Sequence, residues 1–176
     1  HKPVYFEGSE SNGITIDVSF QYCEEYDENT LSFVNNVRTK DGGTHEVGLK
    51  SAFTKAFNDY ARKTGLLKEK DKNLEGNDIR EGLTSIISVK VPEKLLQFEG
   101  QTKSKLGTSE AKGAVENMMY EKLSIYLDEN KETAQILIKK ALKAYQVREA
   151  ARKARDEARG VKKAKVERIL SGKLTP

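Results

Sequence analysis

The chain has 176 residues, of which 36% are hydrophobic and 33% are charged, and its formal net charge is +4. This length allows one hydrophobic core with an appendage, and no window of about 18 uninterrupted apolar residues predicts a transmembrane span. One cysteine and two scattered histidines fit neither an internal disulfide nor a zinc site, so we expect no metal centre and a reducing compartment. The chain starts at His1 with no signal peptide, and we interpret it as a fragment of a longer protein.

The first half of the chain predicts strands. Residues 14–22 alternate apolar and polar side chains, which is typical of a strand with one buried face. A second strand is expected over residues 31–37, and because only a short acidic turn separates the two, we expect an antiparallel hairpin. A further strand is expected over residues 4–7. Residues 83–91 form the most apolar strand, which we place at the centre of the sheet.

Three helices are expected. Apolar residues recur at helical spacing between Thr44 and Tyr60, with Thr44 as N-cap after Gly42 and Gly43. Residues 63–78 are charged and are expected to form a mobile connection. A second helix is expected to start at Ser109, with its hydroxyl as the cap, and a third to follow residue 131.

The basic residues are concentrated near the C-terminus. Ten basic and four acidic residues lie between Lys143 and Arg168, so this segment carries +6 and the remainder of the chain −2. From Ala150 onward the apolar contact positions shrink to Ala151, Ala154 and Ala158, which predicts a helical arm that projects from the body until Gly160 ends it. Such an arm is either a solvated helix or a surface that faces a polyanion, and its charge alone leaves both interpretations open.

Together these elements predict an α+β fold with a small four-stranded, mainly antiparallel sheet, helices on one side and a long C-terminal helical arm. We expect a core over residues 1–130, a long basic helix over residues 131–160 and a linker over residues 161–176.

The loop over residues 97–107 is the most informative segment. Gln101 and Lys103 stand at positions i and i+2, so in an extended loop their side chains point the same way. An amide beside an ammonium group suits a terminal phosphate, whose oxygens accept hydrogen bonds from both. The alternative is a solvated polar connector.

Four segments together resemble a known family. They are residues 33–46 (FVNNVRTKDGGTHE), 78–83 (DIREGL), 97–107 (QFEGQTKSKLG) and 148–155 (REAARKAR). In order and spacing they resemble the transducer domain of the B subunit of bacterial type IIA DNA topoisomerases, which are DNA gyrase and topoisomerase IV. Residues 65–74 and 170–176 are more similar to topoisomerase IV.

The resemblance implies a fold like the second domain of ribosomal protein S5, placed between an N-terminal ATPase domain and a TOPRIM domain to which residues 161–176 would lead. It implies that Gln101 and Lys103, in a Gln-Thr-Lys motif, contact the γ-phosphate of ATP, while Mg²⁺ is bound by the ATPase domain of the intact enzyme. We expect the loop to be mobile without ATP and the fragment alone to be inactive.

The resemblance also implies DNA contacts. Lys50 matches a basic position that lines the cavity for the transported duplex, and the arm residues Arg148, Arg152, Lys153 and Arg155 would lie nearer the DNA gate. Such contacts would be to phosphates and independent of sequence. The implied partners are the topoisomerase A subunit, a second copy of the same subunit and duplex DNA, without a membrane, in the bacterial cytoplasm with the nucleoid.

Two other functions stay open. One is an S5-like nucleic-acid-binding module unrelated to ATP, and the other is a purely structural dimerisation arm. For residues 42–45, we expect a glycine turn before a helix, with His45 as a bridge to the loop or the ATPase domain as the alternative.

Overall fold

The computed structural model describes residues 1–173. Strands and helices follow in the order β1 (Val4–Ser9), β2 (Thr15–Tyr22), β3 (Asn29–Val34), β4 (Val37–Arg38), α1 (Thr44–Lys63), α2 (Gly76–Ile79), β5 (Leu83–Lys90), a 3-10 turn (Glu93–Leu95), α3 (Ser109–Glu129) and α4 (Lys131–Lys173). The fold is α+β, as predicted.

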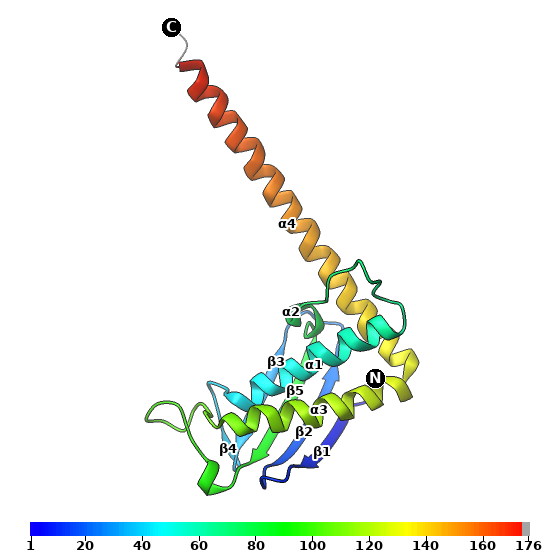
Figure 1. Cartoon of the computed structure of the whole chain (residues 1–176), viewed down its shortest axis with the longest axis vertical. Coiled ribbons are helices and arrows are strands. Elements are labelled where there is room, and N and C mark those ends of the chain that lie inside the picture. Colours follow the sequence, from blue (N-terminus) through cyan, green and yellow to red (C-terminus); the bar gives the residue numbers. More distant parts are fainter. Residues whose placement is uncertain (174–176) are drawn as a thin grey trace.

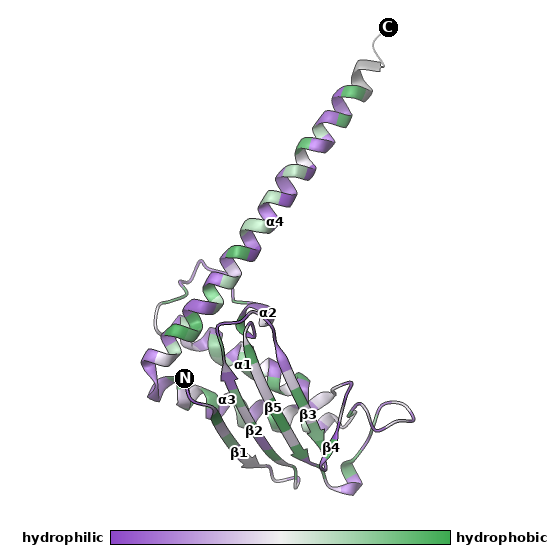
Figure 2. Ribbon diagram, turned by 180° about the vertical axis from the view of Figure 1, so that it is seen from behind, coloured by the Kyte–Doolittle hydropathy of each residue, from purple (hydrophilic) through white to green (hydrophobic). Residues whose placement is uncertain are grey.

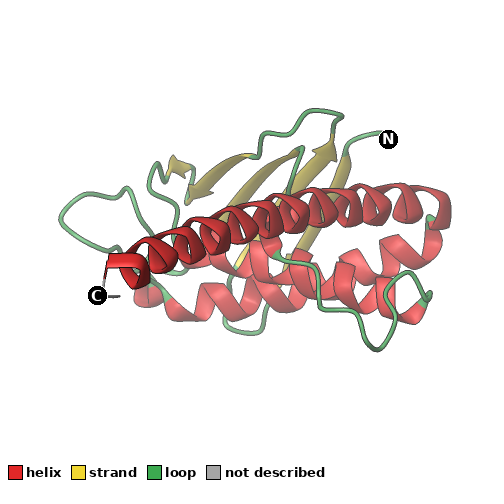
Figure 3. Ribbon diagram, turned by 90° about the horizontal axis from the view of Figure 1, so that it is seen from above, coloured by secondary structure: helices red, strands yellow, loops and turns green. Residues whose placement is uncertain are grey.

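The core lies between one sheet and one layer of helices. The sheet has the strand order β1-β2-β5-β3-β4, so the apolar strand β5 is central, as predicted. Helices α1 and α3 cover one face, which is visible from the front in Figure 1 and from above in Figure 3, whereas Figure 2 shows the sheet from its other side. Phe20, Phe53 and Phe57 are the largest fully buried side chains, and the ring of Phe53 contacts the other two between the two layers.

The predicted hairpin of β2 and β3 is wrong. Strand β5 lies between them, pairing antiparallel with β2 and parallel with β3. Every second residue of β5, from Leu83 to Val89, is buried on the helical side. Because β5 lies in the middle of the sheet, β2 and β3 also cover its two edges. Burial of the most apolar strand therefore outweighs the short sequence separation of β2 and β3.

The sheet has five strands, so the expected count of four is wrong. The predicted strand 4–7 is present as β1, but the predicted strand 31–37 is split in two. Asn35 and Asn36 have φ values of 50° and 67°, which is the left-handed conformation of a tight hairpin turn. Asparagine tolerates this conformation better than most residues, so the chain reverses there and adds β4 to the sheet edge.

The two predicted cap side chains do not cap. Helix α1 begins at Thr44, but its N-cap is Gly43, and the Thr44 hydroxyl donates instead to the carbonyl of Thr108 at 2.6 Å. Helix α3 begins at Ser109, as predicted, with Thr108 as N-cap and no side-chain cap hydrogen bond. The Thr44 hydroxyl therefore joins the starts of α1 and α3.

The connection over residues 63–78 is tied to α1 rather than loose in position. Leu67 and Leu74 are buried in the core, and the Asn58 side chain exchanges two hydrogen bonds with the backbone of Leu74. Arg62 donates to the Asn73 side chain and to two backbone carbonyls of the connection. The connection ends in the short helix α2.

Helix α4 is one continuous helix past Gly160, so the predicted stop there is wrong. A single glycine costs about 1 kcal/mol in a helix, and the alanine, lysine and arginine residues around it favour the helix enough to offset that cost. Its first turns pack on α3 and α2, and the remainder projects from the core (Figure 1). The predicted linker is therefore helical over residues 161–173, and its last three residues lie outside the described part.

Candidate functional site

The loop over residues 97–107 projects beyond the start of α3 (Figure 1). Its two ends are closed on each other by backbone hydrogen bonds. The Gly107 amide donates to the Gln97 carbonyl at 2.8 Å, and the Glu99 amide donates to the Lys105 carbonyl at 2.9 Å. The loop therefore has a fixed base and a tip of five residues.

The base of the loop is also joined to the turn before α1. The amide of Asp41 donates to the carbonyl of Ser104 at 2.9 Å. The amide of Leu106 donates to the carbonyl of Gly42 at 3.1 Å, and the Thr44 amide donates to the Leu106 carbonyl at 3.0 Å. We call these three hydrogen bonds between residues 41–44 and 104–106 the clasp.

The clasp explains why residues 42 and 43 are both glycine. Gly43 has a φ of 143°, and a Cβ atom there would lie 2.5 to 2.7 Å from backbone and side-chain atoms of Leu106. Gly42 has a φ of 76°, which also favours glycine. The predicted glycine turn is therefore confirmed, and its second role is the close approach of two backbone segments.

The tip carries the residues that the sequence selected. Gln101, Thr102 and Lys103 are all exposed. The Thr102 hydroxyl lies 2.9 Å from that of Ser104, and Lys105 forms an ion pair with Glu99 at 3.0 Å. Among the residues that the structure describes, the side chains of Gln101 and Lys103 form no hydrogen bond or ion pair, so both are available to an outside acceptor.

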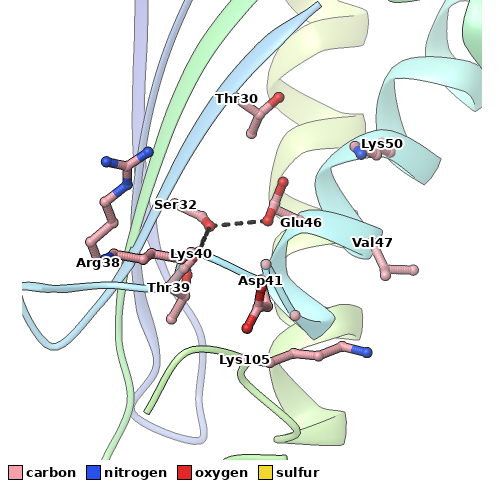
Figure 4. Close-up of a pocket in the computed structure, with 12 residues that line it drawn as sticks. Thr30, Ser32, Arg38, Thr39, Lys40, Asp41, Glu46, Val47, Lys50 and Lys105 are labelled. Atoms are coloured by element: carbon pink, nitrogen blue, oxygen red, sulfur yellow. Dashed lines mark hydrogen bonds between the residues drawn. The ribbon is translucent and has the colours of Figure 1, made fainter. Parts of the chain in front are cut away.

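A polar pocket of about 390 Å³ lies beside the clasp, between the edge of the sheet and the start of α1 (Figure 4). Four of its lining residues are basic: Arg38, Lys40, Lys50 and Lys105. Lys50 comes from α1 and Lys105 from the loop, so the structure brings a predicted DNA-facing residue and the loop base to one cavity. The carboxylates of Asp41 and Glu46 also line the cavity and lower its net positive charge (Figure 4).

A chain of hydrogen bonds runs from this pocket into the core. Glu46 Oε2 lies 3.0 Å from the Ser32 hydroxyl, which lies 2.7 Å from the Thr39 hydroxyl, and that in turn lies 3.2 Å from His45 Nε2. All three contacts are satisfied if neutral His45 carries its proton on Nε2 and each hydroxyl donates toward Glu46. His45 is fully buried, and this desolvation lowers its pKa to about 4.

The structure therefore buries His45 beneath the clasp, and its ring bonds Thr39 instead of the loop. Sequence reasoning missed the roles of Ser32, Thr39 and Glu46. The available signal was the register of β3, in which the hydroxyl residue Ser32 shares the buried face with Val34 while Leu31 is exposed. A polar side chain on a buried face needs a partner, and here Ser32 has two, Thr39 and Glu46.

The predicted DNA-facing residues differ in whether their side chains already form ion pairs with carboxylates of this chain. Lys50 lies 3.9 Å from Glu28, at the limit of an ion pair. Arg148 donates from two nitrogens to the two oxygens of Asp78, at 3.2 and 2.9 Å. The guanidinium of Arg148 is therefore directed at α2 and is already occupied.

Further along the arm the side chains are exposed. Arg152 pairs with Glu149 on the same helix at 2.8 Å, and Arg155 donates to the carbonyl of Ala151 at 3.4 Å. Lys153 is exposed as well. The arm residues do not share a surface with the loop, since α4 starts at the opposite end of the helical layer (Figure 1).

Two kinds of site, a metal-ligand cluster and a membrane-spanning helix, are absent from the residues that the structure describes. No group of three or more His, Cys, Asp or Glu side chains in this part of the chain could hold a metal ion. Likewise, none of its helices combines the length and the hydropathy needed to cross a membrane.

Comparisons with known proteins place the chain among proteins of similar sequence and fold. A family model for DNA gyrase B matches residues 1–157. The chain is 67% identical over 174 residues to the DNA topoisomerase 4 B subunit of Bacillus subtilis (strain 168), covering 98% of this chain and 26% of that protein. It is 63% identical over 177 residues to the corresponding protein of Staphylococcus aureus (strain MW2), again over 26% of that protein. It thus spans about a quarter of these relatives.

Solved structures give a similar result. The 43K ATPase domain of Thermus thermophilus gyrase B, in complex with an aminocoumarin, matches with a TM-score of 0.80 and 42% identity over 89% of this chain and 41% of that one. The topoisomerase IV ATP-binding domain of Francisella tularensis, in complex with a small-molecule inhibitor, matches with a TM-score of 0.72 and 32% identity over 83% of this chain and 39% of that one.

Proposed function

Because the chain belongs to the DNA gyrase B family, we propose that it is the transducer module of an ATP-dependent type IIA DNA topoisomerase, of the topoisomerase IV kind. In this proposal the fold is of the S5 second-domain type, with an additional short edge strand. The matched relatives, which are B subunits of topoisomerase 4, support the subtype. The matched ATPase and ATP-binding domains support a position next to a nucleotide pocket, since this chain covers only about two fifths of each.

One observation carries the proposal: Gln101 and Lys103 are exposed at the tip of a loop whose base is held by the clasp. A lysine ammonium group supplies a compact positive charge, and a glutamine amide supplies a neutral donor. This pair fits the oxygens of a terminal phosphate held by another domain. Because the base is already fixed, only the five-residue tip has to be ordered on binding, so the entropic cost is small.

The mechanism follows from these two side chains and the clasp. The terminal phosphate belongs to an ATP molecule that, with Mg²⁺, the N-terminal ATPase domain would hold. Lys103 would stabilise negative charge on the phosphate oxygens during hydrolysis, and Gln101 would orient them. Both side chains lose their acceptor when phosphate leaves, so the loop is released from the neighbouring domain. Through the clasp, its displacement would reach the start of α1.

The same proposal assigns the basic surfaces to DNA. Lys50, Arg152, Lys153 and Arg155 would contact phosphates of a duplex without reading its sequence, whereas Arg148 is already paired with Asp78. The implied partners are the ATPase and TOPRIM domains of the same polypeptide, the topoisomerase A subunit and a second copy of the B subunit. The place of action would be the bacterial cytoplasm, with the nucleoid. The isolated chain is expected to show no turnover.

The experiment compares Lys103→Ala with Lys105→Ala in the complete B subunit, assembled with its A subunit. Lys105 is the matched control because it is a lysine of the same loop that already pairs with Glu99. We expect Lys103→Ala to retain nucleotide binding but to lose roughly a hundredfold or more in ATPase rate and strand passage, as for removal of a donor to a developing charge. Near-normal ATP-driven relaxation by Lys103→Ala would reject the proposal.

The alternative of an S5-like module unrelated to ATP predicts selective binding of structured RNA by the cationic surfaces. Titration of the complete protein with duplex DNA and structured RNA at two salt concentrations separates the two functions. Weak, unselective and salt-dependent binding supports the transducer, and tight RNA-selective binding supports the alternative.

A further inference from the structure

Helix α4 is held by the core only along its first part. Its residues from Ala134 to Ala141 include four that are buried, whereas every described residue from Ala150 to Ile169 is exposed. Arg148 and Glu149 are the last half-buried residues of the helix. The direction of the projecting arm is therefore set by contacts that end at this point.

Arg148 makes the most specific of these contacts. Its guanidinium forms a two-pronged ion pair with Asp78, whose side chain is only 5% exposed. The same guanidinium lies 3.3 Å from a carboxylate oxygen of Glu75 and 5.3 Å from the ring centre of Tyr145. The hydrogen bond to Asp78 raises the pKa of Arg148. A planar fork on two oxygens fixes an angle as well as a distance, unlike a single lysine contact.

The acceptor of this ion pair is itself fixed. Asp78 lies in α2, and two residues later Arg80 pairs with Glu28 at 2.9 Å and donates to the Asn77 side chain. Glu28 belongs to the segment between β2 and β3. Helix α2 is therefore attached to the sheet on one side and to α4 on the other.

A second contact lies two turns earlier on α4. The ammonium group of Lys140 donates to the backbone carbonyls of Cys23 and Glu25, in the same segment between β2 and β3. Two attachment points eight residues apart lie about 12 Å from each other along a helix. With the buried residues between Ala134 and Ala141 they define the direction of the helix axis, and loss of the outer contact leaves α4 held only up to Lys140 and its buried face.

We propose that the ion pair of Arg148 with Asp78 is the fulcrum that fixes the angle of the α4 arm, and that Arg148 is a positioning residue rather than a DNA contact. About 24 residues follow Glu149 in the helix, a length of about 36 Å, so a tilt of about 10° at the fulcrum moves the far end by about 6 Å. A downstream domain on this arm would be displaced accordingly. The consequence for strand passage rests on the proposed function.

The experiment measures the arm directly. Spin labels are placed on α3 and α4 through Lys122→Cys and Ala158→Cys in the complete protein with its other reactive cysteines replaced, and their distance distribution is recorded by pulsed electron spin resonance. We expect a narrow distribution for the unaltered fulcrum and for Lys139→Gln, which removes an exposed cation of α4. We expect a clearly broader one for Arg148→Gln and Asp78→Asn, with no further broadening in the double variant because both remove one contact.

Arg148→Lys keeps the charge and loses the fork, so it should give an intermediate width. Arg148→Lys also tests the ion pair in place of Asp78→Asn if circular dichroism shows that Asp78→Asn is unfolded. Distributions as narrow as that of Lys139→Gln for both Arg148→Gln and Arg148→Lys would overturn the fulcrum.

The second measurement is the number of strand passages per ATP hydrolysed by the assembled enzyme. We expect this ratio to fall roughly fivefold in Arg148→Gln while DNA affinity and its salt dependence stay unchanged, and to stay unchanged in Lys139→Gln. Loss of DNA affinity with an unchanged distance distribution would make Arg148 a DNA contact instead. An unaltered enzyme without ATP-driven strand passage would reject the proposed function, and the distance distributions would still decide on the fulcrum.

Discussion

Lys103 at the loop tip and Arg148 at the fulcrum are both basic residues that stand out in the sequence, but their charges are placed differently. Lys103 is exposed on a loop whose base is fixed by backbone hydrogen bonds. Arg148 is half-buried and already paired with three carboxylates, those of Glu75, Asp78 and Glu149. A cation without an internal partner can bind an outside anion at little cost, whereas a paired cation must first leave its carboxylate. The exposed Lys103 therefore suits the sensing of a phosphate, and the paired Arg148 suits the fixing of a helix orientation.

The largest effect is expected where the loop meets α1. Gly43→Ala places a methyl group within 2.7 Å of Leu106 and strains a φ of 143°, so we expect a loss of about 4 kcal/mol in the free energy of unfolding. Gly100→Ala at the loop tip has a φ of 80° but no atom within 4 Å of the new methyl group, and should cost about 1 kcal/mol. Urea unfolding of both variants checks the difference. Equal losses would mean that the base of the loop is no more constrained than its tip.

The next largest effect is on the pH dependence of stability, and it comes from His45, the buried end of the hydrogen-bond chain that starts at Glu46. The unfolded chain protonates its histidines below about pH 6.5, whereas folded His45 does so only below about 4. This part of the stability is fully present above pH 6.5 and declines as the pH falls toward 4, by roughly 3 kcal/mol in total. Unfolding measured at pH 7 and pH 4 should show a decline smaller by this amount in His45→Gln than in the unaltered chain.

The fulcrum predicts an intermediate effect on stability. Arg148→Gln leaves the buried Asp78 without its charged donor, and we expect a loss of about 2 kcal/mol. Lys63→Gln breaks the exposed ion pair with Asp128, whose side chains are 67% and 49% exposed, and should cost less than about 0.5 kcal/mol. Urea unfolding tests both variants. Similar small losses would show that the Arg148 contact is an ordinary surface ion pair and would weaken the contrast with Lys103.

The smallest effect concerns DNA binding by the arm. Lys153→Ala should weaken binding of duplex DNA by roughly 1 kcal/mol or less and lower the slope of log affinity against log salt by about one. Arg148→Gln should leave that slope unchanged. Fluorescence anisotropy at three salt concentrations decides, and the reverse result would assign the DNA contact to Arg148.

Local sequence determined much of the fold. The alternation over residues 14–22, the apolar run of β5, the helical spacing of α1 and α3 and the fourth strand at the N-terminus were all predicted, and the structure confirms them. These features depend on side chains a few residues apart, so the pattern alone identifies them. Residue type and spacing also singled out Gln101 and Lys103, and the structure leaves both side chains exposed.

Tertiary structure decided which elements meet. The pairing of β5 between β2 and β3 and the clasp at Gly43 both join segments that the periodicity does not relate. The same holds for Arg148: it belongs to the basic C-terminal segment, which favours a DNA-facing surface, but its partner Asp78 lies seventy residues earlier. Sequence alone therefore determined which residues carry charge, and only the packing of α4 on α2 decided which of those charges remain available, because an ion pair depends on distance in space.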